Sequence, residues 1–372
     1  MDIDLWLIFC RESDMMADPS LALMVGHNVV WQSAFFFTKK GETIALVGNY
    51  DLPDFKRSGR FKTALPYVQD CGREIKKIIE KINPKTIALN FSQNDDAADG
   101  LTHGMYLLLL DYLKGTPFVK RFVSSEKLMS LLRGRKIEEE IMLVASAANL
   151  ATKAWAKSLA EIKMGMSEIE IAQIIDANIK TLGAINSFRT IVNAGVKSDP
   201  GHGHPTAAIL EPGDLLHVDF GARLNGYCSD IQRLAYFKRP EESISPPELT
   251  AAFNKVREII SETSKLYKPG AKGHRIDSIA RTMLKESGYP VYQHALGHQI
   301  GRSVHDGAAT IGPKWKRYGT TPEIPLEPGN LFTVELGIEI PLIGYVGLEE
   351  DLIVTKEGGK FLCPCQTELP II

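Results

Sequence analysis

The first third of the chain alternates short apolar runs with an amphipathic stretch. Runs at residues 5–10, 43–47 and 86–90 have the length and apolar content of buried strands. Between the last two runs, residues 72–81 place isoleucines on one face of a helix, and Pro84 prevents that helix from continuing. These segments predict a strand–helix–strand unit of α/β type.

The pattern changes after residue 125. Residues 136–162 and 168–182 are rich in good helix formers, and Gly- and Pro-punctuated strands follow Gly183. We therefore expect an α/β domain over residues 1–125, and over residues 126–372 an α+β domain whose helices pack on a mostly antiparallel sheet. Its other expected elements are strands at 215–220, 232–237, 331–340 and 351–355 and helices at 248–267 and 274–287.

Composition narrows the class of protein. The 372 residues are 44% hydrophobic and 24% charged, as in ordinary folded proteins, which excludes disorder. The 43 Lys and Arg against 45 Asp and Glu leave a net charge of −2, so we expect no nucleic-acid partner. An odd number of cysteines, an acidic N-terminus and the lack of a long apolar run argue against disulfides, export and membrane insertion. A cytoplasmic location is the expectation.

Two aspartates stand where the pattern predicts neighbouring strands. Asp219 lies in the apolar run 215–220, and Asp230 follows 230 − 219 = 11 residues later, a gap that spans a hairpin. Burying a carboxylate is unfavourable unless it is paired or binds a metal ion. A hydrogen-bonded turn carboxylate is the alternative for either residue alone.

Three histidines cluster further along the chain. His294, His298 and His305 lie among glycines, in a protein with 9 histidines. Neutral imidazole is a good ligand for transition metals, and glycines let the backbone approach a ligand closely. For any one of these histidines alone, an ordinary core position is the alternative interpretation.

Two strand-like segments near the C-terminus carry acidic residues among apolar ones. In the first, alternation places Glu335 on the opposite face from its apolar neighbours Phe332 and Val334. We select Glu335 and Glu349 as candidate ligands, and we interpret Glu339 and Glu350 as ion-paired strand residues. A set of four carboxylates and one imidazole suits two divalent ions bridged by carboxylates, such as manganese, cobalt, iron or zinc, rather than one tetrahedral structural zinc.

In order and spacing, these segments resemble the pita-bread metallopeptidase family, which includes aminopeptidase P, prolidase, methionine aminopeptidase and the metal-free creatinases. The resemblance implies a C-terminal pita-bread catalytic domain and, upstream, a smaller creatinase-type α/β domain. Methionine aminopeptidases typically lack that domain, so the aminopeptidase P and prolidase branch is favoured. The matching motifs are VDFG with Asp219, YCSD with Asp230, LGHQIG with His298, FTVELG with Glu335 and LEEDLIVT with Glu349.

The family resemblance also implies roles for these residues. Asp230 and Glu349 would bridge two ions, Asp219 would chelate one ion and His298 the other, with Mn²⁺ the favoured metal. Glu335, also a metal ligand, would take a proton from the water between the ions and deliver it to the leaving amine, while the resulting hydroxide attacks the peptide carbonyl. His202, in preference to His204, and His305 match the histidines that hydrogen-bond the scissile amide and the oxyanion. A homodimer is expected by the same analogy.

Several positions depart from the family pattern. Leu336 and Glu339 stand where Pro and Tyr are usual, Gly347 replaces an arginine, and the loop after His305 reads DGAAT. Without that arginine, the carboxylate of a dipeptide has no obvious bidentate partner. We therefore predict a metal-dependent aminopeptidase that removes the residue before a proline. An Xaa-Pro dipeptidase, an enzyme of the same fold with a small non-peptide substrate, and a catalytically silent binding protein are the alternatives.

Overall fold

The computed structural model describes residues 2–197 and 203–372. They form two compact units that divide after Leu132, each described here by itself. The sequence placed the boundary after residue 125, before helix α4 (Glu126–Gly134). The division falls later because Met129 of this helix is fully buried in the core of the first unit.

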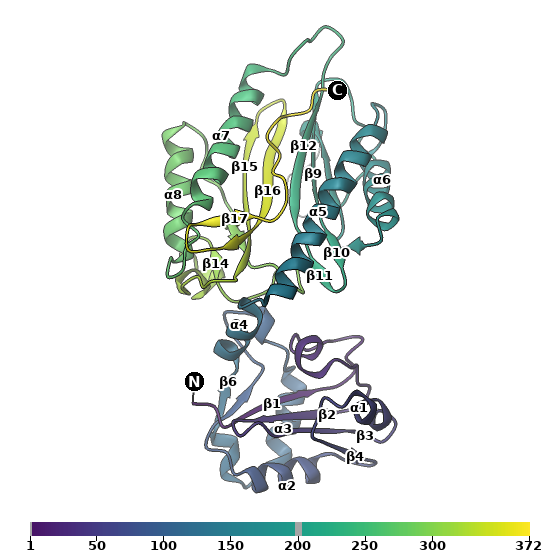
Figure 1. Cartoon of the computed structure of the whole chain (residues 1–372), viewed down its shortest axis with the longest axis vertical. Helices are drawn as coiled ribbons and strands as arrows, with labels where there is room; N and C mark the ends of the chain where they lie inside the picture. Colours follow the sequence, from purple (N-terminus) through teal and green to yellow (C-terminus); the bar gives the residue numbers. More distant parts are fainter. Residues whose placement is uncertain (1, 198–202) are drawn as a thin grey trace. The chain divides into compact units, whose positions relative to one another are not determined.

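The first unit contains a six-stranded sheet in the order β4-β3-β2-β1-β5-β6 (Figure 1). Strand β1 pairs antiparallel with β2 and parallel with β5. Its side chains alternate between two cores: Leu5 and Leu7 pack with α2 and α3, whereas Trp6 and Ile8 pack with α1 and α4. The predicted α/β unit is thus a mixed sheet covered on both faces. The strands are β1 (Leu5–Cys10), β2 (Ser33–Thr38), β3 (Thr43–Gly48), β4 (Thr63–Tyr67), β5 (Ile87–Leu89) and β6 (Phe122–Ser124), and the other helices are α1 (Leu52–Ser58), α2 (Gly72–Ile82) and α3 (His103–Tyr112).

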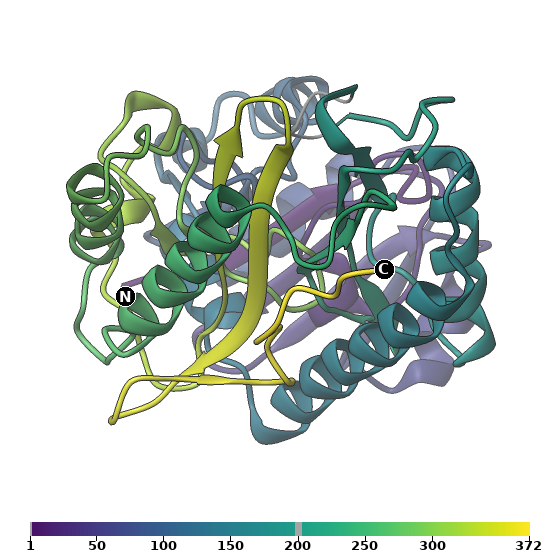
Figure 2. The same ribbon diagram turned by 90° about the horizontal axis from the view of Figure 1, so that it is seen from above.

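The second unit is built on an antiparallel sheet whose path is β15-β16-β12-β9-β8, with β17 beside β16. Helices α5 and α6 cover the part of the sheet around β9 and β12, and α7 and α8 cover the part around β15 and β16 (Figure 1 and Figure 2). The predicted antiparallel sheet with two helix pairs is therefore confirmed. The helices are α5 (Glu138–Glu161), α6 (Glu168–Thr181), α7 (Pro247–Ser264) and α8 (Gly273–Glu286), and the strands are β7 (Ile185–Asn186), β8 (Ile191–Ala194), β9 (Asp214–Phe220), β10 (Ala222–Leu224), β11 (Tyr227–Cys228), β12 (Ile231–Phe237), β13 (Gly297–His298), β14 (Thr310–Ile311), β15 (Leu331–Ile340), β16 (Gly344–Val354) and β17 (Gly359–Phe361).

Alternation along β9 decides which side chains pack against helices α5 and α6 and which lie on the opposite face of the sheet. Leu216, Val218 and Phe220 pack in the core formed with α5 and α6. Successive strand residues point to opposite faces, so His217 and Asp219 face away from that core. The same rule holds in β15, where the apolar neighbours of Glu335 pack with α7 and leave the carboxylate on the other face.

The sequence missed several strands. Edge strand β8 lies beside β9, and the short strands β7, β10 and β11 form a separate three-stranded sheet. Strand β16 begins at Gly344, well before the expected residue 351. Gly344 and Gly347 lower the strand propensity of its first half, although the segment that carries Glu349 is strand-like from Gly344 onward.

Candidate active site

The register of the sheet aligns four polar side chains across four strands. Asp219 of β9 is opposite Gln232 of β12, Gln232 is opposite Glu349 of β16, and Glu349 is opposite Glu335 of β15. Directly opposed residues share a face of the sheet, with Cβ atoms about 4.5–5.5 Å apart. Backbone pairing alone thus brings Asp219 into one row with Glu335 and Glu349, which lie more than 100 residues further along the chain.

Asp230 and His298 approach this row from the ends of other elements. Asp230 immediately precedes β12, and its backbone N–H donates to Asp351 at 3.1 Å. The Nε2 atom of His298 lies 3.7 Å from Asp230, 3.8 Å from Glu349 and 4.0 Å from Glu335. Two ligands each about 2.1 Å from one ion lie at most about 4.2 Å apart, so these separations suit a shared ion. Asp230, His298 and Glu349 can each offer one donor atom within 4.8 Å of the others.

Burial and mutual proximity raise the pKa values of the carboxylates in this group. Asp230 is 5% exposed and Glu349 only 2%. Burial raises the pKa of Asp219 to about 7 and, together with the charge of Asp219, that of Glu335 to about 8. Burial and neighbouring carboxylates also raise the pKa of Asp230 and of Glu349 well above their ordinary values. The group is therefore poised to take up protons or cations.

Unsatisfied oxygen atoms show that divalent ions fit this group. Asp219 Oδ1, Asp230 Oδ1 and Glu349 Oε1 are buried and accept no hydrogen bond from any residue that the structure describes. Buried polar atoms are normally paired, and an orphaned one calls for an explanation such as a bound ion. Oxygen donors with one imidazole are a ligand set for Mn²⁺, Fe²⁺, Co²⁺ or Zn²⁺.

Gln232 and His217 form a hydrogen-bonded chain to Glu349 and Glu335. Neither residue was among the candidates selected from the sequence. The Gln232 amide donates to Glu349 at 2.8 Å and to Glu335 at 3.3 Å, and its oxygen lies 2.9 Å from His217 Nε2. His217 is buried against Asn193, and burial lowers its pKa to about 4, so its imidazole is neutral at pH 7. The signal was available, since His217 is a polar residue in an apolar strand two positions before Asp219.

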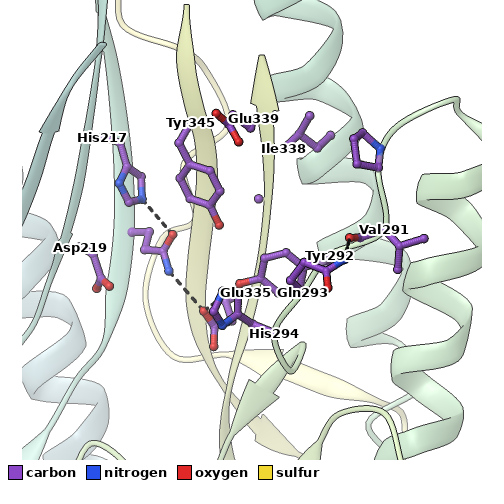
Figure 3. A pocket seen from close by; sticks show the side chains of 13 residues that line it. His217, Asp219, Val291, Tyr292, Gln293, His294, Glu335, Ile338, Glu339 and Tyr345 are labelled. Atoms are coloured by element: carbon purple, nitrogen blue, oxygen red, sulfur yellow. Dashed lines mark hydrogen bonds between the residues drawn. The ribbon is translucent and has the colours of Figure 1, made fainter. Parts of the chain in front are cut away.

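The hydrogen-bonded chain lies on one wall of a cavity of about 290 Å³, which we name the aromatic cavity (Figure 3). Tyr292 donates to Glu335 at 3.4 Å, and the ring of Tyr345 meets His217 edge-on at 5.0 Å. A Cβ atom at Gly337 or at Gly347 would overlap the Tyr345 side chain. These two glycines therefore make the room in which Tyr345 lies.

The glutamates set aside from the candidate ligands behave differently from each other. Glu350 forms a buried ion pair with Arg233 at 2.9 Å, which confirms its interpretation as an ion-paired strand residue. Arg233 also donates to the backbone oxygen of Glu349 at 3.0 Å and so supports the site from behind. Glu339 forms no ion pair within the described parts of the chain and instead lines the aromatic cavity, so the same interpretation is wrong for it. Glu339 is exposed near the end of β15.

A second cavity, of about 320 Å³, is also lined by these carboxylates, and we name it the arginine cavity. It contains Arg189, His204 and His305 and shares Asp219 and Glu335 with the aromatic cavity. The carboxylate group is thus open to two separate spaces.

His305 is held in the arginine cavity by the residue that follows it. Asp306 is buried and forms ion pairs with Arg133 and with Lys136, the latter at 3.0 Å. The ring of His305 packs edge-on against that of His298, with centroids 4.4 Å apart. A buried ion-paired aspartate thus fixes the loop that carries His305.

The other candidate histidines lie in different places. His202 lies outside the described residues. His204 lines the arginine cavity, and His294 lines the aromatic cavity, where it packs against Tyr292 (Figure 3). The sequence pointed to His294 only as one of three clustered imidazoles.

Comparison with known proteins shows which family this chain matches. Residues 143–356 match metallopeptidase family M24. The Xaa-Pro dipeptidase of Pyrococcus horikoshii is 33% identical over 266 residues, which cover 70% of this chain and 71% of the relative. The Xaa-Pro dipeptidase of Pyrococcus furiosus is 33% identical over 267 residues, which cover 70% and 72%.

Solved structures are similar along the whole chain. The Xaa-Pro dipeptidase of Bacillus anthracis superposes with a TM-score of 0.82 at 26% identity, covering 100% of this chain and 95% of its own. The X-Pro aminopeptidase of Thermotoga maritima gives a TM-score of 0.80 at 25% identity, covering 100% and 98%. The expected pita-bread domain, preceded by a smaller α/β domain, is confirmed. The chain therefore belongs to metallopeptidase family M24, in its prolidase and aminopeptidase P branch, and is a metal-dependent hydrolase.

Proposed function

We propose that this enzyme is an aminopeptidase that hydrolyses the bond between an N-terminal residue and a following proline. The observation that carries the proposal is the row of carboxylates Asp219, Glu349 and Glu335, set in register across the sheet and joined by Asp230 and His298. Relatives named Xaa-Pro dipeptidase and X-Pro aminopeptidase support proline in the second position.

The five candidate ligands would hold two divalent ions, with Mn²⁺ proposed as the metal. Asp230 and Glu349 are the proposed bridging ligands, Asp219 would bind one ion and His298 the other. When bound, divalent ions supply Lewis-acid polarisation of the scissile carbonyl and lower the pKa of water to near neutrality.

Glu335 is the proposed proton carrier of the reaction. Its Oε2 is near the Gln232 amide and the Tyr292 hydroxyl, which leaves Oε1 on the side of His298. A carboxylate at this position is suited to accept a proton and to return it to the leaving amine. His305, at the wall of the arginine cavity, is proposed to donate a hydrogen bond to the carbonyl oxygen as negative charge develops there, and His202 is proposed for the scissile amide.

The aromatic cavity favours an aminopeptidase over a strict dipeptidase. Its described lining contains carboxylate, imidazole, amide and phenol groups but no Lys or Arg. A dipeptide that placed its free carboxylate there would meet the charge of Glu339 and find no Lys or Arg to pair with. A longer peptide carries an uncharged amide at that point and avoids the repulsion.

Release of the N-terminal residue tests the proposal. We would compare Xaa-Pro tripeptides, matched Xaa-Ala tripeptides and Xaa-Pro dipeptides, using enzyme stripped of metal and then reloaded with manganese, cobalt or zinc. We expect metal-dependent cleavage of the Xaa-Pro tripeptides and weak cleavage of the other two groups. Strong cleavage of dipeptides would make the enzyme a dipeptidase, and no cleavage despite bound metal would favour a non-peptide substrate.

Two further expectations accompany this proposal. We propose a homodimer, by analogy with the family, and a cytoplasmic location, which the five free cysteines fit because thiols stay reduced there. Among the described residues, every helix lacks the length or the apolar character that crossing a membrane requires.

A further inference from the structure

Arg189 is the one permanent cation among the described residues that line the arginine cavity. The other non-ligand side chains there are the imidazoles of His204 and His305 and the apolar groups of Phe188, Ile191 and Val304. Arg189 is exposed to the cavity and to solvent, and it forms no hydrogen bond or ion pair with any residue that the structure describes. A guanidinium with five donors is thus available beside the carboxylate group.

The backbone that carries Arg189 is anchored on both sides. Thr190, the next residue, is buried and donates to Asp176 of helix α6 at 2.6 Å, and Asn186 donates to the same carboxylate. Ser187 donates to the backbone oxygen of Ser229 at 2.8 Å, directly before Asp230. Arg189 therefore projects from a fixed segment that is tied to the candidate metal ligands, which limits the ordering cost when its side chain binds.

The balance of charges around Arg189 indicates which kind of ligand group it would bind. Four carboxylates, from Asp219, Asp230, Glu335 and Glu349, carry four negative charges when ionised, and two divalent ions would offset all four. The guanidinium of Arg189 is then left as an uncompensated positive charge in the cavity. Arginine matches the planar geometry of a carboxylate and binds it through two parallel charge-assisted hydrogen bonds.

We propose that Arg189 is a specificity-determining residue that binds a carboxylate of the substrate in the arginine cavity. This inference rests on the proposed peptidase function. The carboxylate has two possible sources, the acidic side chain of an N-terminal Asp or Glu and the free C-terminus of a short peptide. Phe188 and Val304 add apolar surface to the lining of the same cavity.

The test compares peptides that differ by one carboxylate. One pair is Glu-Pro-Ala-amide with Gln-Pro-Ala-amide, and the other is the dipeptide Ala-Pro with Ala-Pro-amide. Wild-type enzyme, Arg189→Ala and Arg189→Lys would each be loaded with manganese and assayed for kcat and KM. Arg275→Ala is the matched control, because Arg275 is an exposed arginine on α8 that lines neither cavity and has no ion pair in the described chain.

We expect Arg189→Ala to lower the preference for the acidic member of one pair by about 10- to 100-fold in kcat/KM, mainly through KM, as loss of a bidentate charge-assisted contact would. The pair that responds identifies the source of the carboxylate. Arg189→Lys should retain part of the preference, and Arg275→Ala all of it. An equal loss on both members of both pairs would overturn the inference, because a merely structural role acts on every substrate alike.

Failure of the peptidase proposal would give a different result. If manganese-loaded wild-type enzyme cleaves none of the four peptides, calorimetric titration with glutarate and with glutaramide tests the cavity directly. Glutarate binding that is at least tenfold weaker in Arg189→Ala than in wild type would support the inference without peptidase activity. Equal glutarate affinity in the two proteins would refute it.

Discussion

The two cavities at the carboxylate group share Asp219 and Glu335 but offer a substrate different chemistry. The aromatic cavity is lined by neutral groups, chiefly His217, Gln232, Tyr292 and Tyr345, together with acidic side chains. The arginine cavity contains a guanidinium that no described residue neutralises. This difference in charge is the basis on which we propose that the site distinguishes the parts of a peptide.

The largest expected effect comes from loss of Asp230, a carboxylate that lines the arginine cavity and is proposed to bridge the two ions. Asp230→Ala should lower metal content and reduce kcat/KM by at least about 1,000-fold, because Asp230 is a proposed bridging ligand. Metal analysis and peptide release measure the two losses together. Glu286→Ala, at the exposed end of α8, is the control for removal of one carboxylate, and an Asp230→Ala enzyme with full metal content and activity would contradict the assignment.

Next in size is the loss of the amide link on the aromatic side. Gln232→Leu keeps the approximate volume but removes the donor to Glu349 and Glu335, and a hydrogen bond to a charged group contributes about 1.5–3 kcal/mol. We expect kcat to fall by about 10- to 100-fold, with KM for neutral peptides changed less. Gln293→Leu, also in the aromatic cavity but outside this chain, is the matched control. A wild-type kcat in Gln232→Leu would show that the carboxylates need no such positioning.

The glycine that replaces the family arginine gives a test of packing. Gly347→Ala places a Cβ atom 2.6 Å from Gln232 Oε1 and 2.9 Å from His217 Nε2, besides overlapping Tyr345. Such overpacking costs about 1–3 kcal/mol of unfolding free energy. Denaturant unfolding should show this loss, and the double variant Tyr345→Ala/Gly347→Ala should lose less than the sum of its single changes. Strict additivity would mean that Tyr345 does not occupy the space over Gly347.

The pH dependence of stability sharpens the account of the shared carboxylates. Folding raises the pKa of Asp219 to about 7 and that of Glu335 to about 8, from ordinary values of 3.8 and 4.5. Acids whose pKa is raised by folding favour the folded state while protonated, so the metal-free protein should lose stability as pH rises from about 4 to 8. Metal ions remove this cost, so metal should raise Tm by a few degrees more at pH 8 than at pH 6.

A variant without these two ionisations provides the control for that measurement. Asp219→Asn/Glu335→Gln should show a flatter dependence of Tm on pH when metal is absent. An equally steep profile in the double variant would assign the pH dependence to other groups.

The smallest effect is expected from Glu339→Gln, which removes an exposed charge at the aromatic cavity and should change kcat/KM for neutral peptides by less than about threefold.

Much of the architecture followed from local patterns in the sequence. The strands Leu5–Cys10 and Leu331–Ile340 have the expected bounds, and the main helices begin and end within a few residues of their predicted limits. These elements have strong periodicity or clear capping residues, which are properties of neighbouring residues alone. Strand β16 begins before the expected residue 351, because Gly347, which the packing of Tyr345 requires, weakens the local strand signal.

The residue types of the site were also fixed by sequence, since Asp219, Asp230, His298, Glu335 and Glu349 stood out as polar groups in apolar or glycine-rich surroundings. Only the tertiary structure decided how they meet. The register β9-β12-β16-β15 aligns residues more than 100 positions apart, and no local periodicity encodes the pairing of distant strands. His217 stood out as a polar residue in an apolar strand, but its link through Gln232 to the carboxylates, like the place of Arg189 in the arginine cavity, depends on which groups surround each side chain in space.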